Sequence, residues 1–148
     1  MKVKDFMKQS VYCIKPDTNI TEIAKVMNNN HIGCVPVCDT NNILCGILTD
    51  RDILLRAVAC NKDLNSTIAS DIMTTRVYTC KKDEDIKNAE NIMAEEKIRR
   101  LPVCDERNHV IGILTFGDLA QKNNEIGNEK LGQTLNNICN SDTNKNNM

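Results

Sequence analysis

An internal duplication constrains this sequence more than any other feature. Residues recur after 66 positions (102 minus 36, for Pro102 and Pro36), and the register needs no gap across about fifty residues. The matching pairs include Asp5 and Asp71, Met7 and Met73, Ile20 and Ile86, Met27 and Met93, and the segments 36–39 and 102–105. Chance similarity does not hold one register for so long. The chain therefore carries two copies of one structural unit, each too small to be comfortably stable alone.

Each copy contains Gly-Ile-Leu-Thr followed by two variable residues and an aspartate, at 46–52 and at 112–118. Thr-x-x-Asp after an apolar strand predicts a capping box, in which the threonine is the N-cap of a helix and the aspartate lies at N3. The same helix start offers a hydroxyl, backbone N–H groups and a carboxylate, which suit phosphate and ribose. The residues alone leave both interpretations open.

The apolar pattern of each copy predicts the order β-α-β-β-α, an α/β (α+β) fold of two pseudo-symmetric repeats. Residues 11–14 and 77–80 are short β-prone runs, and Asn19 and Asp85 are good N-caps for the helices that follow. Apolar strands at 34–38 and 101–104 each lead through a polar turn into a second strand and a second helix. The apolar helix positions are Ile20, Ile23, Ala24 and Met27 in the first copy and Ile86, Ala89 and Met93 in the second, where Glu90 interrupts the stripe.

The predicted boundaries are 3–60 for the first repeat, 61–68 for a polar linker and 69–122 for the second repeat. Residues 123–148 form a polar, asparagine-rich tail that we expect to be partly disordered. Ile126, Leu131, Leu135 and Ile138 fit a weak amphipathic helix in this tail, but Gly127 and Gly132 oppose it.

Composition narrows the classes of function. The formal net charge of −1 at pH 7 gives no basic surplus for nucleic acid, and no apolar run approaches the roughly 20 residues that a bilayer requires. The N-terminus has no apolar signal core, so we expect a soluble, cytoplasmic protein without nucleic-acid or membrane partners. The eight cysteines form no Cys-x-x-Cys pair and several lie in apolar runs where valine would serve equally well, which favours reduced, mostly structural thiols and no metal site.

The sequence contains no motif that is typical of an enzyme active site. The sequence has no Ser or Cys nucleophile with a plausible His and acid partner, and it has neither of the glycine-rich phosphate loops, Gly-x-x-x-x-Gly-Lys and Gly-x-Gly-x-x-Gly. One aspartate at an equivalent place in each repeat is not a catalytic dyad. We therefore expect no catalytic residues.

Together these motifs resemble a tandem pair of cystathionine-β-synthase (CBS) domains. The resemblance covers about Val3 to Ala120 and rests on Asp-x-Met, a helix, hydrophobe-Pro-Val-x-Asp and Gly-h-h-Thr-x-x-Asp, all present twice. It implies that the two repeats pack through their sheets into one module, and that two modules form a homodimer. It also implies a regulatory ligand such as AMP, ADP, ATP, S-adenosylmethionine or a dinucleotide, bound between repeats, with no cofactor required.

The resemblance implies two ligand sites, each pairing Thr-x-x-Asp of one repeat with strand residues of the other. The preferred site would comprise Thr49, Arg51, Asp52, Arg76, Val77, Tyr78, Ile98, Arg99 and Arg100. The second site would comprise Thr115, Phe116, Asp118, Val11, Tyr12, Ile32, Gly33 and Cys34. Asp52 and Asp118 would hold ribose, the threonines would contact ribose or phosphate, and the arginines of the first set suit phosphate because their planar groups make paired bonds.

Three functional hypotheses follow. The first is a sensor without catalytic activity that binds an adenine nucleotide or S-adenosylmethionine and acts on a protein partner that the sequence does not identify. The second is a dimerisation and protein-interaction scaffold in which Thr-x-x-Asp serves only as a cap. The third is a metal or redox sensor that uses the cysteines.

Overall fold

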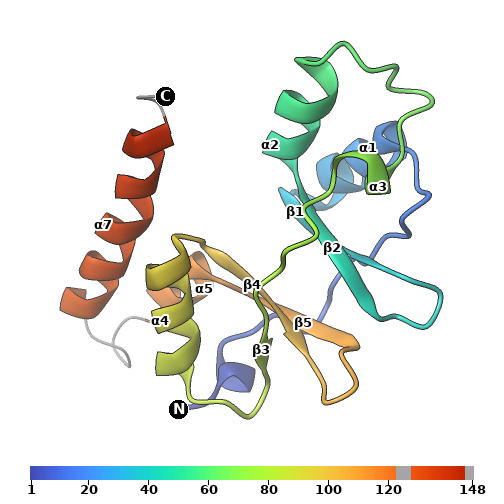
Figure 1. Ribbon diagram of the computed structural model, residues 1–148. Coiled ribbons are helices and arrows are strands. Elements are labelled where there is room, and N and C mark those ends of the chain that lie inside the picture. Colours follow the sequence, from blue (N-terminus) through green and yellow to red (C-terminus); the bar gives the residue numbers. More distant parts are fainter. Residues whose placement is uncertain (123–127, 146–148) are drawn as a thin grey trace. The chain divides into compact units, whose positions relative to one another are not determined.

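The chain is described from a computed structural model over residues 1–122 and 128–145, and it divides into two compact units (Figure 1). Unit 1 comprises Met1–Gln9, Tyr78–Asp105 and Ile111–Met148, and unit 2 comprises Ser10–Val77 and Glu106–Val110. The first nine residues thus pack with the second sequence repeat. The mixture of helices and small sheets in the two units is the predicted α+β class.

Helix α1 (Ile20–Asn30) of unit 2 begins as predicted at Asn19, whose side chain accepts a hydrogen bond from Thr21 N at 2.8 Å. Ile20, Ile23 and Met27 are buried in the core of the unit. The predicted apolar stripe is wrong at Ala24, which is exposed. The buried face of α1 is therefore narrower than the sequence pattern predicts.

Strands β1 (Cys34–Cys38) and β2 (Leu44–Thr49) form an antiparallel hairpin in which Cys34 pairs with Thr49. Helix α2 (Asp50–Asp52) follows at once and runs into a π-helical segment, η2 (Ile53–Val58). Helix α3 (Ala69–Ile72) leads to Thr74, which exchanges two 2.9 Å backbone hydrogen bonds with Ile47. Thr49 is thus both the last residue of β2 and the N-cap of α2.

The predicted strand over residues 11–14 is present only as a single bridge. Ile14 pairs in parallel with Val37, while Tyr12 and Cys13 are exposed. The following Pro16 and Asp17 form a turn, so the segment leaves β1 after one bridge.

Unit 1 repeats this plan around a three-stranded sheet in the order β3-β4-β5 (Figure 1). The strands are β3 (Cys80–Lys81), β4 (Arg100–Cys104) and β5 (Val110–Thr115), and β3 runs parallel to β4. Helix α4 (Ile86–Glu96) begins at the predicted cap Asp85, and α5 (Phe116–Gln121) follows β5. A 3₁₀ turn, η1 (Val3–Asp5), leads to Lys8, which exchanges backbone hydrogen bonds with Ile113.

The tail contributes helix α7 (Asn128–Lys145), which lies beside α4 in unit 1 (Figure 1). Leu131, Thr134 and Ile138 are buried, whereas the predicted apolar position Leu135 is exposed. Glu90, which interrupted the apolar stripe of α4, is fully buried beneath α7. The predictions that concern Ile126, Gly127 and residues 146–148 lie outside the described residues.

Candidate functional site

In unit 2, Thr49 and Asp52 close the predicted capping box at the start of α2. Asp52 N donates to Thr49 Oγ1 at 3.1 Å, and Thr49 N donates to Asp52 Oδ2 at 3.0 Å. Asp50 N donates to the carbonyl of Gly33 at 3.0 Å, which ties the helix start to the residue before β1. The prediction that Thr49 and Asp52 form a capping box is therefore confirmed.

The cap engages only one oxygen of Asp52. Oδ1 faces the Arg56 guanidinium, with Nε at 3.6 Å, and the Asp52 side chain is 15% exposed. Arg56 is itself held in place, because its Nη1 donates to Ile72 O at 3.0 Å and to Thr74 Oγ1 at 3.2 Å. A carboxylate oxygen can accept two hydrogen bonds, so Oδ1 keeps acceptor capacity for a ligand hydroxyl.

Unit 1 contains the equivalent cap at the start of α5. Asp118 N donates to Thr115 Oγ1 at 3.1 Å, and Thr115 N donates to Asp118 Oδ2 at 2.9 Å. Phe116 N donates to the carbonyl of Arg99 at 2.8 Å. Asp118 Oδ1 lies 3.4 Å from Lys8 Nζ, and the Asp118 side chain is only 6% exposed.

The two threonine hydroxyls differ. Thr115 Oγ1 also donates to Asp118 Oδ2 at 2.8 Å, so its proton is used within the cap. Among the hydrogen bonds of the described residues, Thr49 Oγ1 acts only as an acceptor. Thr49 thus keeps a donor and Asp52 is the more exposed acid, and both features suit a ligand better than the cap of unit 1.

Sequence reasoning missed the cations beside these acids, Arg56 and Lys8. Arg56 could have been found, because Asp52 and Arg56 are four residues apart on a predicted helix and such pairs face each other. Lys8 lies far from Asp118 in the sequence. It reaches the acid only because residues 1–9 pack with unit 1 and Lys8 pairs with Ile113.

Each predicted ligand set draws on residues of both units, so the pairing within each set stays a prediction. Thr49, Arg51, Asp52, Arg76 and Val77 belong to unit 2. So do the strand and loop residues of the second set, which are Val11, Tyr12, Ile32, Gly33 and Cys34. Unit 1 holds Tyr78, Ile98, Arg99, Arg100, Thr115, Phe116 and Asp118.

The residues of the two predicted sets differ in burial. Some are apolar side chains that pack against a core, and others are arginines that are exposed or partly buried. Tyr78, Ile98 and Phe116 pack against the core of unit 1, and Ile32 packs against the core of unit 2. Arg51, Arg76 and Arg99 are exposed, and Arg100 is partly buried in β4. Tyr12, a member of the second predicted set, is exposed.

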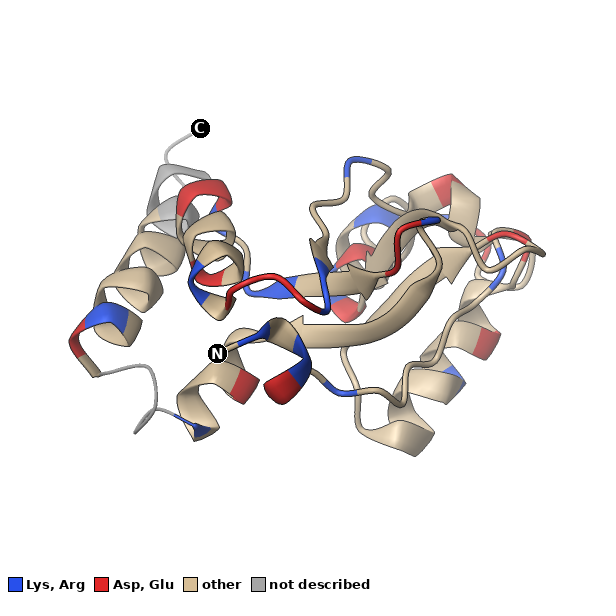
Figure 2. Cartoon of the chain, turned by 90° about the horizontal axis from the view of Figure 1, so that it is seen from below, with Lys and Arg blue, Asp and Glu red and all other residues tan. Residues whose placement is uncertain are grey.

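The described residues give no support for a metal site or a membrane-spanning helix. Over residues 1–122 and 128–145, no three His, Cys, Asp or Glu side chains gather as metal ligands would. In the same part of the chain, no helix is long and apolar enough to span a membrane. Lys and Arg are interspersed with Asp and Glu in both units (Figure 2).

Comparison with known families gives a match over most of the chain. The CBS domain model matches residues 3–59 and again 69–124. The CBS domain-containing protein YhcV of Bacillus subtilis (strain 168) is 38% identical over 136 residues, which cover 92% of this chain and 94% of that protein.

Solved structures agree with this match. The CBS domain pair of protein MJ0100, solved with 5′-methylthioadenosine and S-adenosyl-L-methionine, has a TM-score of 0.76 and 30% identity, covering 84% of this chain and 97% of that chain. CBSX2, solved in complex with AMP, has a TM-score of 0.72 and 27% identity, covering 86% of this chain and 98% of that chain. Both similar structures thus hold ligands that contain adenosine.

Proposed function

The chain belongs to the CBS domain family, and we propose that it is a regulatory module, without catalytic activity, that binds an adenosyl ligand. One observation carries the proposal. In each unit the aspartate of Thr-x-x-Asp uses Oδ2 for the helix cap, and among the described residues its Oδ1 faces one cation. The two similar structures solved with adenosyl ligands support this interpretation.

The proposed contacts follow from the chemistry of the cap. The ribose of the ligand donates hydroxyl protons to Asp52 Oδ1, and the Thr49 hydroxyl donates to ribose or phosphate. A charge-assisted hydrogen bond to a carboxylate is worth about 1.5–3 kcal/mol, enough to discriminate ligands with and without ribose hydroxyls. Arg99 and Arg100 contact phosphate, and the apolar Val77, Tyr78 and Ile98 border the purine.

Within this proposal the preferred site, here called the Asp52 set, binds AMP, ADP or ATP. The second site, here called the Asp118 set, binds a less charged ligand such as S-adenosylmethionine. The basis is the charge of the predicted residues. The Asp52 set contains Arg51, Arg76, Arg99 and Arg100, whereas the strand residues assigned to Asp118 carry no charge. Guanidinium groups favour phosphate because their planar forks make paired hydrogen bonds to its oxygens.

We also propose that the module is a homodimer that acts in the cytoplasm on a protein partner. The η2 segment presents Leu54, Leu55 and Val58, which are 58%, 46% and 47% exposed. Apolar side chains gathered on one exposed segment are typical of an interaction surface. Light scattering should report a dimer, and Leu54→Glu should produce a monomer; a wild-type monomer contradicts this part of the proposal.

The second candidate function is an interaction scaffold without a ligand. It is favoured by the completeness of both capping boxes, which explain Thr-x-x-Asp without any ligand. The two functions differ in one measurable property, because only the sensor binds adenosyl compounds.

Calorimetric titration of the full chain with AMP, ADP, ATP, NAD and S-adenosylmethionine tests the proposal. Binding of at least one compound is expected, and absence of binding by all of them at about millimolar concentration contradicts the adenosyl sensor. The double variant Arg99→Ala with Arg100→Ala is expected to bind AMP more weakly than wild type does. Its affinity for 5′-methylthioadenosine, which has no phosphate, should be unchanged. Equal weakening of both compounds contradicts the phosphate role of the arginines.

A further inference from the structure

Two cysteine thiols of unit 2 lie together where residues 11–14 meet strand β1. Ile14 N donates to Pro36 O at 3.0 Å, and Cys38 N donates to Ile14 O at 2.8 Å, so the two segments are fixed side by side. Cys13 directly precedes Ile14, and its side chain shares a hydrogen bond with the side chain of Cys38. Both residues are reduced thiols in this structure.

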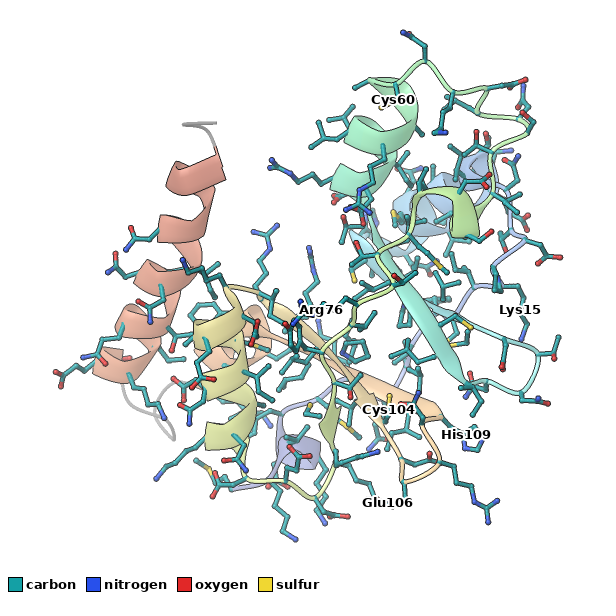
Figure 3. The ribbon with its side chains drawn as sticks, viewed as in Figure 1. Lys15, Cys60, Arg76, Cys104, Glu106 and His109 are labelled. Carbon is teal, nitrogen blue, oxygen red and sulfur yellow. The ribbon has the colours of Figure 1, made fainter. Side chains whose placement is uncertain are left out.

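The two thiols differ in exposure. Cys13 is exposed, whereas Cys38 is buried behind it. Lys15, labelled in Figure 3, donates from Nζ to Asp39 O at 2.9 Å, which anchors its positive charge beside the pair. The hydrogen bond from Cys38 lowers the pKa of the Cys13 thiol, the partial desolvation of this exposed side chain opposes that shift, and the charge of Lys15 assists it. An exposed thiol with thiolate character is the reactive kind.

The second repeat shows that the fold does not require this pair. The residues 66 positions after Cys13, Lys15 and Cys38 are Thr79, Lys81 and Cys104. Lys81 Nζ donates to Asp105 O at 2.5 Å, so the lysine and the strand end are arranged as in unit 2. Only the exposed thiol is missing, since threonine stands in its place. The neighbouring Cys80 is buried, which raises its pKa to about 12.

We propose that Cys13 and Cys38 form a redox-responsive pair that hydroperoxides oxidise to an intramolecular disulfide. The Cys13 thiolate attacks the peroxide O–O bond, an S–O bond forms, and the leaving oxygen departs as alkoxide or hydroxide and takes a proton. Cys38 then attacks the sulfur of this sulfenic acid, an S–S bond forms, and the hydroxyl group leaves as water with the Cys38 proton. Two thiols and one hydroperoxide thus yield one disulfide, one alcohol or water, and one water.

The disulfide has a structural consequence. It closes a loop that contains α1 and ties residues 11–14, held to β1 by one bridge, covalently to the end of that strand. Such a crosslink restricts the unfolded chain, so oxidation should raise the melting temperature. This response requires no adenosyl ligand. The test of the disulfide is therefore independent of the test of the proposed function.

The test uses the full chain, reduced and then treated with hydrogen peroxide. Remaining thiols are alkylated, and digestion with mass spectrometry locates every disulfide. The expected product is one Cys13–Cys38 link that dithiothreitol reverses. Alkylated Cys13 after the treatment, or a link from Cys13 to Cys34, Cys45 or another chain, overturns the proposal.

Matched variants separate the pair from general thiol oxidation. Cys13→Thr reproduces the arrangement of the second repeat at an exposed position, and it should abolish both the disulfide and the rise in melting temperature. Cys60→Ser, which removes another exposed thiol, should leave both unchanged. A peroxide-induced rise in melting temperature that persists in Cys13→Thr, or that disappears in Cys60→Ser, contradicts the assignment.

Discussion

The Nζ atom of Lys8 lies 3.4 Å from Oδ1 of Asp118, whose other oxygen caps helix α5. In unit 2 the equivalent Asp52 faces Arg56, which comes from η2, the segment that directly follows α2. The residues 66 positions after Lys8 and Arg56 are Thr74 and Lys122, so the two cations do not correspond in the duplication. Each unit nevertheless places one cation beside the oxygen that the cap leaves available.

The cap and the ion pair of Asp118 should contribute unequally to stability. Asp118→Ala removes the acceptor of Thr115 N, and loss of such a cap costs about 1–2 kcal/mol. Lys8→Ala removes only an exposed cation, which is worth less than about 1 kcal/mol. Urea unfolding of both variants checks the order, and a larger loss for Lys8→Ala contradicts it.

Gly46 and Gly112 are required by close backbone contacts. A Cβ at Gly46 would lie 2.9 Å from Thr74 O, and a Cβ at Gly112 would lie 2.8 Å from Lys8 O. Alanine at either position should therefore cost about 1–3 kcal/mol, because the partner atom is backbone. Gly132 in α7 is the matched control, since nothing lies within 4 Å of its Cβ position.

Gly132→Ala should instead stabilise the protein by about 0.5–1 kcal/mol through the greater helix propensity of alanine. Thermal unfolding of the three variants measures both signs. Destabilisation by Gly132→Ala, or neutrality of Gly46→Ala and Gly112→Ala, would contradict this explanation of the glycines.

Glu90 should couple α4 to α7. Thr134 Oγ1 donates to its Oε1 at 3.3 Å, and Lys130 Nζ lies 3.5 Å from its Oε2, which has no hydrogen-bond partner among the described residues. Lys130→Met leaves a buried carboxylate without its cation, so it should destabilise the protein by about 1–3 kcal/mol. The double variant Glu90→Leu with Lys130→Met should recover most of that loss, because no buried charge remains.

A double-mutant cycle in urea measures this coupling. Additive effects of the two substitutions would mean that the Glu90 carboxylate does not depend on Lys130. Leu135→Ala, at an exposed position of α7, should change stability little and serves as the control.

Cys80 should make stability fall at alkaline pH. Burial, followed by the charge of Glu84 and the neighbouring Cys104, raises its pKa from 9.0 to about 12. Above pH 9 the thiol ionises in the unfolded chain but keeps its proton in the fold, so unfolding releases a proton and becomes easier as pH rises. The contribution is constant below pH 9 and is lost towards pH 12, with a slope of at most about 1.4 kcal/mol per pH unit.

The measurement compares wild type with Cys80→Ala in urea between pH 8 and about pH 11, where both still fold. The variant should have the shallower decline because it lacks this thiol. Parallel curves would contradict a raised pKa. Cys60→Ala, at an exposed thiol, is the control and should follow the wild-type curve.

Much of the fold was predictable because the duplication and local signals agree. Asn19 and Asp85 cap α1 and α4 as their side chains suggested, and both Thr-x-x-Asp motifs close capping boxes. Local hydrogen-bonding chemistry is visible in a sequence because its partners are two or three residues apart.

Features that depend on distant segments were not predictable in this way. Residues 11–14 have strand composition, but only Ile14 finds a partner in β1. Glu90 interrupts an apolar stripe and is nevertheless buried, because α7 supplies Thr134 and Lys130 from the tail. Lys8 reaches Asp118 by the same kind of long-range contact, which no periodicity encodes.

Titration of AMP into wild type and Asp52→Asn tests whether the Asp52 carboxylate binds the ribose. Asparagine retains an acceptor for Thr49 N, so the cap survives, but it replaces the second acceptor oxygen with an amide donor that cannot receive a ribose hydroxyl proton. Wild type should bind AMP, Asp52→Asn should bind it at least about tenfold more weakly, and the two proteins should have nearly the same thermal stability without ligand. Equal affinity of the two proteins for AMP would contradict this role of Asp52.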